Sequence, residues 1–278
     1  MAVWLDYTED KADDEHTVVG TLKALDGVES PQLDNQRDLL VYLPPDYDTG
    51  SSRYPVIYLH DGQNLFDAHT SFAGEWQVDE TMEGLSREGI EAIVVGIANN
   101  SEERLDEYSP FRDPERGGGR GDHYLSFIVN TIKPLIDASF RTLPGREHTG
   151  IMGSSMGGLI SLYAYFRHPE VFGFAGALSP AFWFAKGAIY DYVQEAAFSP
   201  GRIYMDAGTR EHGEGRRWTS IPWRSRRYYA GVRRMNRMLA KKGYRPRRDL
   251  LYVEEKWANH EEAAWARRLP QAIRFLLG

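Results

Sequence analysis

Short apolar segments alternate with amphipathic segments of helical length along most of this 278-residue sequence. The apolar segments have the length of buried strands and lie at residues 54–59, 90–97, 149–153, 172–178, 203–207 and 250–253. Segments with apolar residues at helical spacing lie between or after them, at residues 76–85, 124–136, 159–166, 228–239 and 262–277. Strands that alternate with helices need crossover connections, so the pattern predicts an α/β fold with a central, mostly parallel sheet flanked by helices on both faces.

Two further strands are predicted ahead of this pattern, at residues 18–22 and 39–43. No linker rich in Pro, Gly or Ser divides the chain, and no internal repeat is visible. We therefore expect one α/β domain over residues 1–278, in which residues 1–38 form an acidic N-terminal extension and an early strand.

The sequence contains no cysteine, which excludes a disulfide framework, a thiolate nucleophile and a Cys-ligated metal site. The longest uncharged stretches, residues 151–166 and 171–185, are shorter than the roughly 18 apolar residues of a membrane span. The first residues are acidic, the reverse of a positively charged leader, so we expect a cytoplasmic protein that does not cross a membrane.

The net charge of −7 is unevenly distributed, because residues 201–278 hold 19 Lys and Arg against 8 Asp and Glu. A basic segment of this size can indicate nucleic-acid binding. The Lys and Arg residues recur through the predicted helix at 228–239 and its flanks, so we favour a solvated helix face that lies beside the acidic remainder of the chain. No nucleic-acid partner is expected, and the oligomeric state stays open.

The sequence GSSMG at residues 153–157 matches the G-x-S-x-G pattern, centred on Ser155. A predicted strand leads directly into it and a predicted helix follows, which is typical of the sharp turn that exposes a nucleophilic serine above a sheet. Glycine is needed on both sides because this turn brings strand and helix close together. Ser155 is therefore the candidate nucleophile.

A serine nucleophile needs a base within hydrogen-bond reach and a third group that orients the base. In this architecture the chain order is serine, acid, histidine. Of the three histidines after Ser155, His168 lies where the following helix ends and His212 lies too close to the acid candidates. His260, in the loop between the last strand and the last helix, is the predicted base.

Glu211 is the first choice for the acid because it follows the end of the predicted strand 203–207, on the same sheet edge as Ser155. Asp206 is the alternative, although it lies inside the strand and is expected to point into a flanking layer. Glu214 is the third candidate. A Ser-His dyad without a well-placed acid is also open.

Two backbone N–H groups commonly stabilise the oxyanion of acyl transfer. Met156 should supply one, at the N-terminal end of its helix. The loop after the strand at 54–59 should supply the other, and Gln63 is the predicted donor, with Gly62 allowing a close approach of the backbone. For Asp61 and Asn64, a plain Asx turn and a substrate contact are equally supported.

Five segments together are similar to the “putative esterase” branch of the α/β-hydrolases: YLHDGQNLF at 58–66, the stretch at 153–173, ALSPAFWF at 177–184, IYMDAGTRE at 203–211 and the C-terminal stretch from residue 259. That branch includes enterochelin, feruloyl and acetyl esterases, S-formylglutathione hydrolases and mycolyltransferases. The resemblance implies an α/β-hydrolase fold, with Ser155 as nucleophile, His260 as base and Glu211 at a position where some members carry Asp. It also implies Gln63 and Met156 as oxyanion donors. The segment before residue 39 resembles nothing in the family.

The predicted function is therefore a serine carboxylesterase that hydrolyses a small-molecule ester through an acyl-enzyme, without a cofactor. No metal is expected in the reaction, because the chain has no Cys and no His-x-x-x-His or His-Glu-x-x-His spacing. An acyltransferase that uses the same site, or a catalytically inactive binding module with this fold, are the alternatives.

The sequence offers two candidate determinants of the substrate. Aromatic residues could wall an acyl pocket, although core packing explains them equally well: Phe182, Trp183, Phe184, Trp218 and Trp223. Arginines after the strand at 90–97 could bind an anionic ester, although a charged surface loop is the favoured interpretation: Arg104, Arg112, Arg116 and Arg120.

Overall fold

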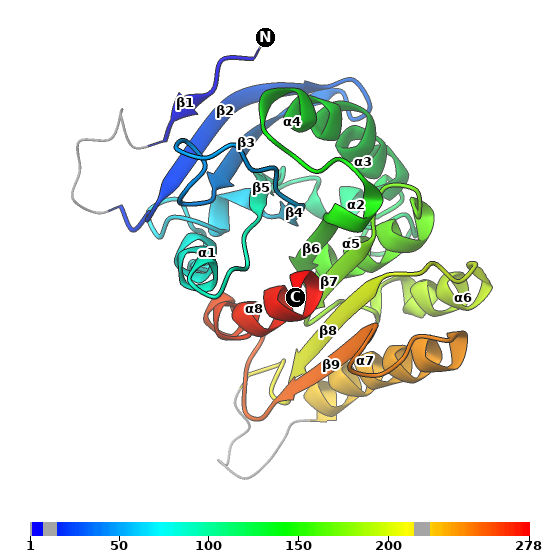
Figure 1. The fold of residues 1–278 in the computed structure, drawn as a ribbon. Helices are drawn as coiled ribbons and strands as arrows, with labels where there is room; N and C mark the ends of the chain where they lie inside the picture. The colour runs from blue at the N-terminus through cyan, green and yellow to red at the C-terminus, as the bar shows by residue number, and fades with distance from the viewer. Residues whose placement is uncertain (1, 8–15, 214–222) are drawn as a thin grey trace.

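A single sheet forms the centre of the computed structural model, which describes residues 2–7, 16–213 and 223–278 (Figure 1). Within those residues the strand order is β1-β2-β3-β5-β4-β6-β7-β8-β9. The strands are β1 (Leu5–Asp6), β2 (Thr21–Ser30), β3 (Asn35–Leu43), β4 (Val56–His60), β5 (Ile93–Ile97), β6 (Thr149–Ser154), β7 (Phe174–Leu178), β8 (Arg202–Gly208) and β9 (Leu250–Glu255). The strands from β5 to β9 run parallel, and β1, β2 and β3 add to one edge in antiparallel fashion.

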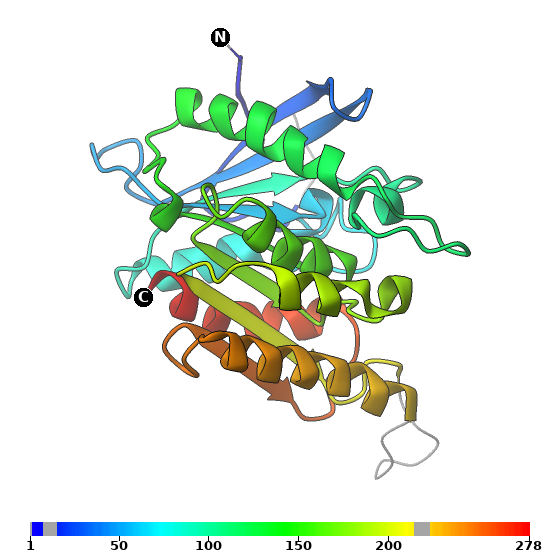
Figure 2. The same ribbon diagram turned by 90° about the vertical axis from the view of Figure 1, so that its right-hand side faces the viewer.

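Helices cover both faces of the sheet. They are α1 (Val78–Ser86), α2 (Arg104–Glu107), α3 (Gly121–Phe127), α4 (Lys133–Ser139), α5 (Met156–Arg167), α6 (Ala188–Glu195), α7 (Trp223–Lys242) and α8 (Glu262–Leu277). Figure 2 shows α3, α4, α5, α6 and α7 on one face, with α1 and α8 behind the sheet. A π-helical turn, Ile128–Ile132, joins α3 to α4, so the helix predicted at 124–136 continues through it.

Two hydrophobic cores lie on the two faces, and β4 shows how its sequence fills both. Val56 and Tyr58 point into the core beneath α3, α4 and α5, while Ile57 and Leu59 point into the core beneath α1 and α8. Because both faces of this strand are buried, it reads as a continuous apolar run and not as an alternating pattern. The predicted α/β class with helices on both faces is confirmed.

The N-terminal part of the prediction needs correction. The strand expected at 18–22 is instead β2, which begins at Thr21 and continues to Ser30 as an antiparallel partner of β3. Most of β2 is only partly buried and rich in polar residues, so it has no apolar run to mark its length. The short helices α2 and α6 were not predicted either.

The parallel strands all present their carboxyl ends at one edge of the sheet, and the predicted site residues follow those ends. Ser155 follows β6, Glu211 comes three residues after β8 and His260 lies in the loop after β9. Ligands of open α/β sheets bind at this edge. Among the described residues, no helix is both long and apolar enough to cross a membrane.

Candidate active site

Ser155 lies at the turn between β6 and α5 in a backbone conformation that is rare for a residue with a side chain, with φ 55° and ψ −117°. Such conformations cost about 1–3 kcal/mol and persist only where the surroundings impose them. Here the Ser155 N–H donates to the Leu178 carbonyl at 3.0 Å, and the Ala181 N–H donates to the Ser155 carbonyl at 2.8 Å. The turn is therefore fixed by the end of β7 and the segment that follows it.

Glycine is required on both sides of this turn because His60, the last residue of β4, packs beneath it. A Cβ at position 153 would lie 2.7 Å from Cδ2 of His60 and 3.1 Å from the backbone of Gly157. A Cβ at position 157 would lie 3.3 Å from Cβ of His60. The predicted close approach of strand and helix is thus present, and the His60 ring is part of its cause.

The hydrogen bonds of His60 define its tautomer. Ser161 Oγ donates to the Gly157 carbonyl at 2.7 Å, so it accepts from Nε2 of His60 at 3.1 Å. Nδ1 then accepts from the Tyr124 hydroxyl at 2.8 Å. Burial lowers the pKa of His60 to about 3, and the neighbouring Asp61 only partly offsets this, so His60 is a neutral structural residue at neutral pH.

The structure brings together His260 and Glu211. Nδ1 of His260 lies 2.6 Å from Oε2 of Glu211, whose side chain is fully buried, while the His260 side chain is 27% exposed. An ionised carboxylate can only accept, so Nδ1 carries the proton and donates it to Glu211. Nε2 of the neutral imidazole is then an acceptor, which is the form that a general base requires.

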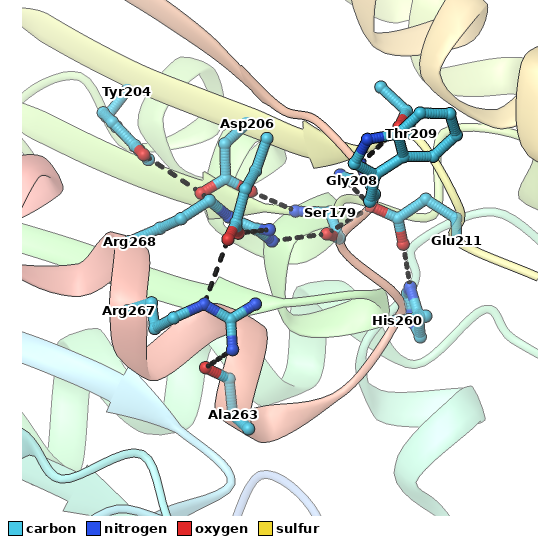
Figure 3. A network of polar contacts seen from close by, with 12 residues as sticks. Ser179, Tyr204, Asp206, Gly208, Thr209, Glu211, His260, Ala263, Arg267 and Arg268 are labelled. Carbon is cyan, nitrogen blue, oxygen red and sulfur yellow. Dashed lines mark hydrogen bonds and ion pairs between the residues drawn. The ribbon is translucent and has the colours of Figure 1, made fainter. Parts of the chain in front are cut away.

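A second set of buried polar groups bonds to the carboxylate oxygen of Glu211 that does not contact His260 (Figure 3). Oε1 of Glu211 accepts from the Ser179 hydroxyl at 2.7 Å and from the Gly208 N–H. Ser179 Oγ in turn accepts from the Arg268 guanidinium at 2.9 Å. Both carboxylate oxygens of Glu211 are therefore occupied, and its orientation toward His260 is fixed.

Asp206 belongs to the layer beneath that set. It is fully buried within β8, and one of its oxygens accepts from the Ser179 N–H at 2.9 Å. The other accepts from the Tyr204 hydroxyl at 3.0 Å and pairs with Nε of Arg268 at 2.9 Å. The expectation that Asp206 points into a flanking layer agrees with these contacts. The third acid candidate, Glu214, lies outside the described residues, as does Trp218.

Tyr228, on α7, is a site residue that the sequence did not single out. Its ring meets the His260 ring edge-on at 5.5 Å, and its hydroxyl donates to the Ser179 carbonyl at 2.7 Å. Burial raises the pKa of Tyr228 well above its usual value, and the charge of Glu211 adds to this, whereas hydrogen bonds with Trp183 and Ser155 act in the opposite direction. Tyr228 therefore contacts both the serine turn and the base, but nothing in its local sequence distinguishes it from other apolar positions of α7.

The predicted oxyanion donors lie on two segments that follow neighbouring strands. Met156 is the first residue of α5, where a backbone N–H has no partner inside the helix. Gln63 lies in the 3-10 turn Gly62–Asn64 after β4, and its side-chain oxygen accepts from the Asn99 N–H at 3.2 Å. A Cβ at Gly62 would lie 2.7 Å from the backbone of Gly96, so this glycine brings the turn against β5.

Asp61 and Asn64 have structural partners. Asp61 is buried and forms two hydrogen bonds with Arg104, at 2.7 Å each, and one with Asn99 at 2.6 Å. Asn64 accepts from the Phe72 N–H at 3.0 Å. Arg104, one of the four arginines considered for anion binding, is therefore engaged by Asp61.

The aromatic candidates separate into two groups. Phe182 and Phe184 are buried in the core, so core packing accounts for them and a direct role for Phe182 in substrate binding is disfavoured. Trp183 and Trp223 are 46% and 66% exposed. The Arg116 guanidinium lies over the Trp183 ring at 5.4 Å, so an aromatic and a cationic group meet at the surface beside Tyr228.

A family model described as “Putative esterase” matches residues 30–276. The chain belongs to this family. It is a serine-type carboxylic ester hydrolase with the α/β-hydrolase fold, and the family resemblance noted from the sequence is confirmed. The match begins inside β2, so most of the N-terminal segment lies outside it.

Relatives of this esterase are similar over different lengths. Uncharacterized protein YbbA of Bacillus subtilis is 29% identical over 249 residues, which cover 87% of this chain and 93% of that protein. The siderophore triacetylfusarinine C esterase of Aspergillus fumigatus is 31% identical over 147 residues, 50% of this chain and 48% of the relative.

Two solved structures share the fold of this esterase. The BES protein from Bacillus cereus has a TM-score of 0.72 and 18% identity, with 96% of this chain and 99% of that chain covered. The enterobactin esterase FES from Shigella flexneri has a TM-score of 0.72 and 19% identity, with 98% of this chain and 62% of that chain covered.

The buried His60 makes a prediction about stability and pH. Its pKa is about 3 in the folded protein against an ordinary 6.5, so the unfolded state binds a proton at a higher pH than the folded state does. Stability from this group is present above pH 6.5 and is lost as the pH falls toward 3. His60→Gln should make the dependence of the unfolding free energy on pH shallower below pH 6.5, by up to about 1.4 kcal/mol per pH unit.

Urea unfolding at several pH values measures this slope. His123→Gln is the matched control, because His123 is exposed on α3. Equal slopes in the wild type and His60→Gln would show that His60 is not held neutral.

Proposed function

We propose that this protein is a carboxylesterase that works through an acyl-enzyme on Ser155, with His260 as the base and Glu211 as the orienting acid. The observation that carries the proposal is the 2.6 Å contact between Nδ1 of His260 and the fully buried Glu211. Ser155 supports it, because it occupies a strained turn and shares the neighbour Tyr228 with His260.

In the proposed mechanism, Nε2 of His260 takes the proton of the Ser155 hydroxyl as its oxygen attacks the ester carbonyl. The imidazolium that forms is stabilised by Glu211, which stays ionised. The N–H groups of Gln63 and Met156 stabilise the oxyanion, and the start of α5 adds the favourable end of its dipole. His260 then donates its proton to the departing alcohol, and water attacks the acyl-enzyme by the same steps.

For the substrate, we propose a small-molecule ester with an aryl or apolar acyl group. The exposed Trp183 and Trp223 support it, since they are the accessible aromatic groups among the predicted pocket residues that the structure describes. Relatives are named siderophore esterases and a feruloyl esterase, and a feruloyl group is an aryl acyl group. Arg116, stacked on Trp183, adds a positive charge that favours an anionic ester.

The first prediction from this proposal concerns the nucleophile. A fluorophosphonate probe should label the wild-type protein stoichiometrically at Ser155, and Ser155→Ala should lose both labelling and turnover of p-nitrophenyl butyrate. Ser154→Ala is the matched control, because Ser154 ends β6 next to the turn and has no proposed role in the chemistry. Full activity of Ser155→Ala would contradict the proposal.

The second prediction separates the two acid candidates. Glu211→Gln should lower kcat by a factor of about 10 to 10⁴, because the imidazolium loses its partner, while the protein stays folded. Asp206→Asn removes one of the two carboxylate partners of the buried Arg268, the other being Glu255, and should instead lower the unfolding free energy, by roughly 3 kcal/mol. Rates and urea unfolding of both purified variants give the ranking, and the reverse ranking would assign the acid role to Asp206.

The third prediction concerns specificity. If Trp183 contacts the acyl group, aryl and medium-chain esters should exceed acetate in kcat/KM, because apolar burial contributes about 25 cal/mol per Å² and acetyl offers little area. Trp183→Ala should reduce that preference, and Trp257→Ala, another exposed tryptophan, should not. A panel of aliphatic, aryl, sugar-acetyl and catecholate esters at low and high salt also tests Arg116, because salt screens anion binding. A preference for short neutral esters that neither Trp183→Ala nor salt changes would exclude both determinants.

A further inference from the structure

Three carboxylates gather where the chain enters α1, away from the proposed catalytic groups. Glu75 precedes the helix, and Asp79 and Glu80 lie in its first turn. One oxygen of each lies within 4.8 Å of the others. Glu75 and Glu80 line a surface cavity of about 580 Å³ between α1 and α8, and Asp79 is buried behind them.

Half of the carboxylate oxygens of this acidic cluster lack partners. One oxygen of each carboxylate is buried without a hydrogen-bond partner: Glu75 Oε1, Asp79 Oδ1 and Glu80 Oε2. The unpartnered oxygen of Asp79 is the strongest evidence for a missing partner, because this residue is 0% exposed. Its Oδ2 accepts from the Val19 N–H at 2.7 Å, while its Oδ1 has no partner. A buried charged oxygen without a partner is costly, so native proteins rarely leave one.

Neighbouring groups of the described chain do not neutralise the cluster. Two arginines line the same cavity, but Arg267 pairs with Glu255 and Arg274 pairs with Glu88. The start of α1 supplies roughly half a positive charge through its dipole, less than the three negative charges of the fully ionised cluster. Burial and the charge of Glu80 raise the pKa of Glu75 to about 7, and burial and the contact with Glu80 raise that of Asp79 to about 8.

We propose that Glu75, Asp79 and Glu80 bind one divalent cation with oxygen ligands, of the calcium or magnesium class. Ca²⁺ binds carboxylate oxygens at about 2.3–2.6 Å, so two ligands on opposite sides of it lie roughly 5 Å apart. The three carboxylate oxygens lie within 4.8 Å of one another, so one cation of this size can contact all three. The open cavity leaves room for water to complete the coordination.

The cation would connect three parts of the fold. Oε2 of Glu75 accepts from the Thr17 hydroxyl at 3.0 Å, and Asp79 accepts from Val19, so the cluster already holds residues 17–19 against α1. The backbone N–H of the adjoining Trp76 donates to the Asn64 carbonyl at 2.9 Å, in the predicted oxyanion turn. This is a structural site, so the expectation that the reaction itself needs no metal is unaffected.

The test uses the full chain after dialysis against EDTA and then chelator-free buffer at about pH 8. Millimolar Ca²⁺ or Mg²⁺ should raise the Tm by about 3 °C or more over sodium chloride of equal ionic strength, because a ligand that binds only the folded state stabilises it. Isothermal titration calorimetry should give one site per chain. Neither readout depends on the esterase activity.

Variants distinguish binding of the cation at this cluster from its general screening of surface charges. Asp79→Asn should keep or raise the Tm in EDTA, because it removes a buried unpaired charge, and should abolish the response to the cation. Glu80→Gln should lower the calorimetric affinity for the cation at least tenfold. Glu88→Gln is the matched control, since it removes one acidic charge at the other end of α1 and should leave the response intact.

The absence of both a Tm shift and calorimetric binding with Ca²⁺, Mg²⁺ and Mn²⁺ would overturn the proposal and assign the neutralisation to protons shared among the carboxyl groups. An unchanged response in both Asp79→Asn and Glu80→Gln would also overturn it, because the cation would then bind elsewhere. If Asp79→Asn does not fold, Glu80→Gln and the wild-type titration still decide the question.

Discussion

The close packing of β4, β6 and α5 around the His60 ring is the constraint on which the site depends. The ring fills the space beneath the serine turn and leaves no room for a side chain at position 153. The turn then holds Ser155 at a positive φ, with its backbone bonded to the segment after β7. A neutral His60 suits this position because both of its ring nitrogens are satisfied without a charge.

The acid side of the site depends on a second constraint, which the same segment after β7 supplies. Ser179 donates its hydroxyl to Glu211 and its N–H to Asp206, and it accepts from Arg268 on α8. The two acidic residues that the sequence made rivals therefore have complementary positions in one network (Figure 3). Glu211 faces His260, and Asp206 holds Arg268 and Ser179 in the layer below. A charge removed from either position affects the other through Ser179.

The N-terminal segment is where the structure adds most to the sequence. Residues 17–19 lie across the start of α1, bonded to Glu75 and Asp79, and β2 extends the sheet beyond the parallel core. Most of this part precedes the family match, which starts at residue 30. The acidic cluster, the cavity beside it and the loop to the predicted oxyanion turn form one connected region. Its contacts link the extension to the core of an enzyme whose proposed catalytic groups come from elsewhere in the chain.

The sequence by itself determined the α/β class, because each buried parallel strand must be apolar along its whole length and each covering helix must repeat its apolar residues at helical spacing. It also singled out Ser155 as the candidate nucleophile, since the G-x-S-x-G turn is local, and it ranked His260 and Glu211 by their positions after strand ends. Only the tertiary structure decided how Tyr228, Ser179 and Arg268 surround that pair, because these contacts join residues far apart in the chain. The same holds for the buried oxygens of Glu75, Asp79 and Glu80: three acidic residues at a helix start look like ordinary surface charges until packing removes them from water.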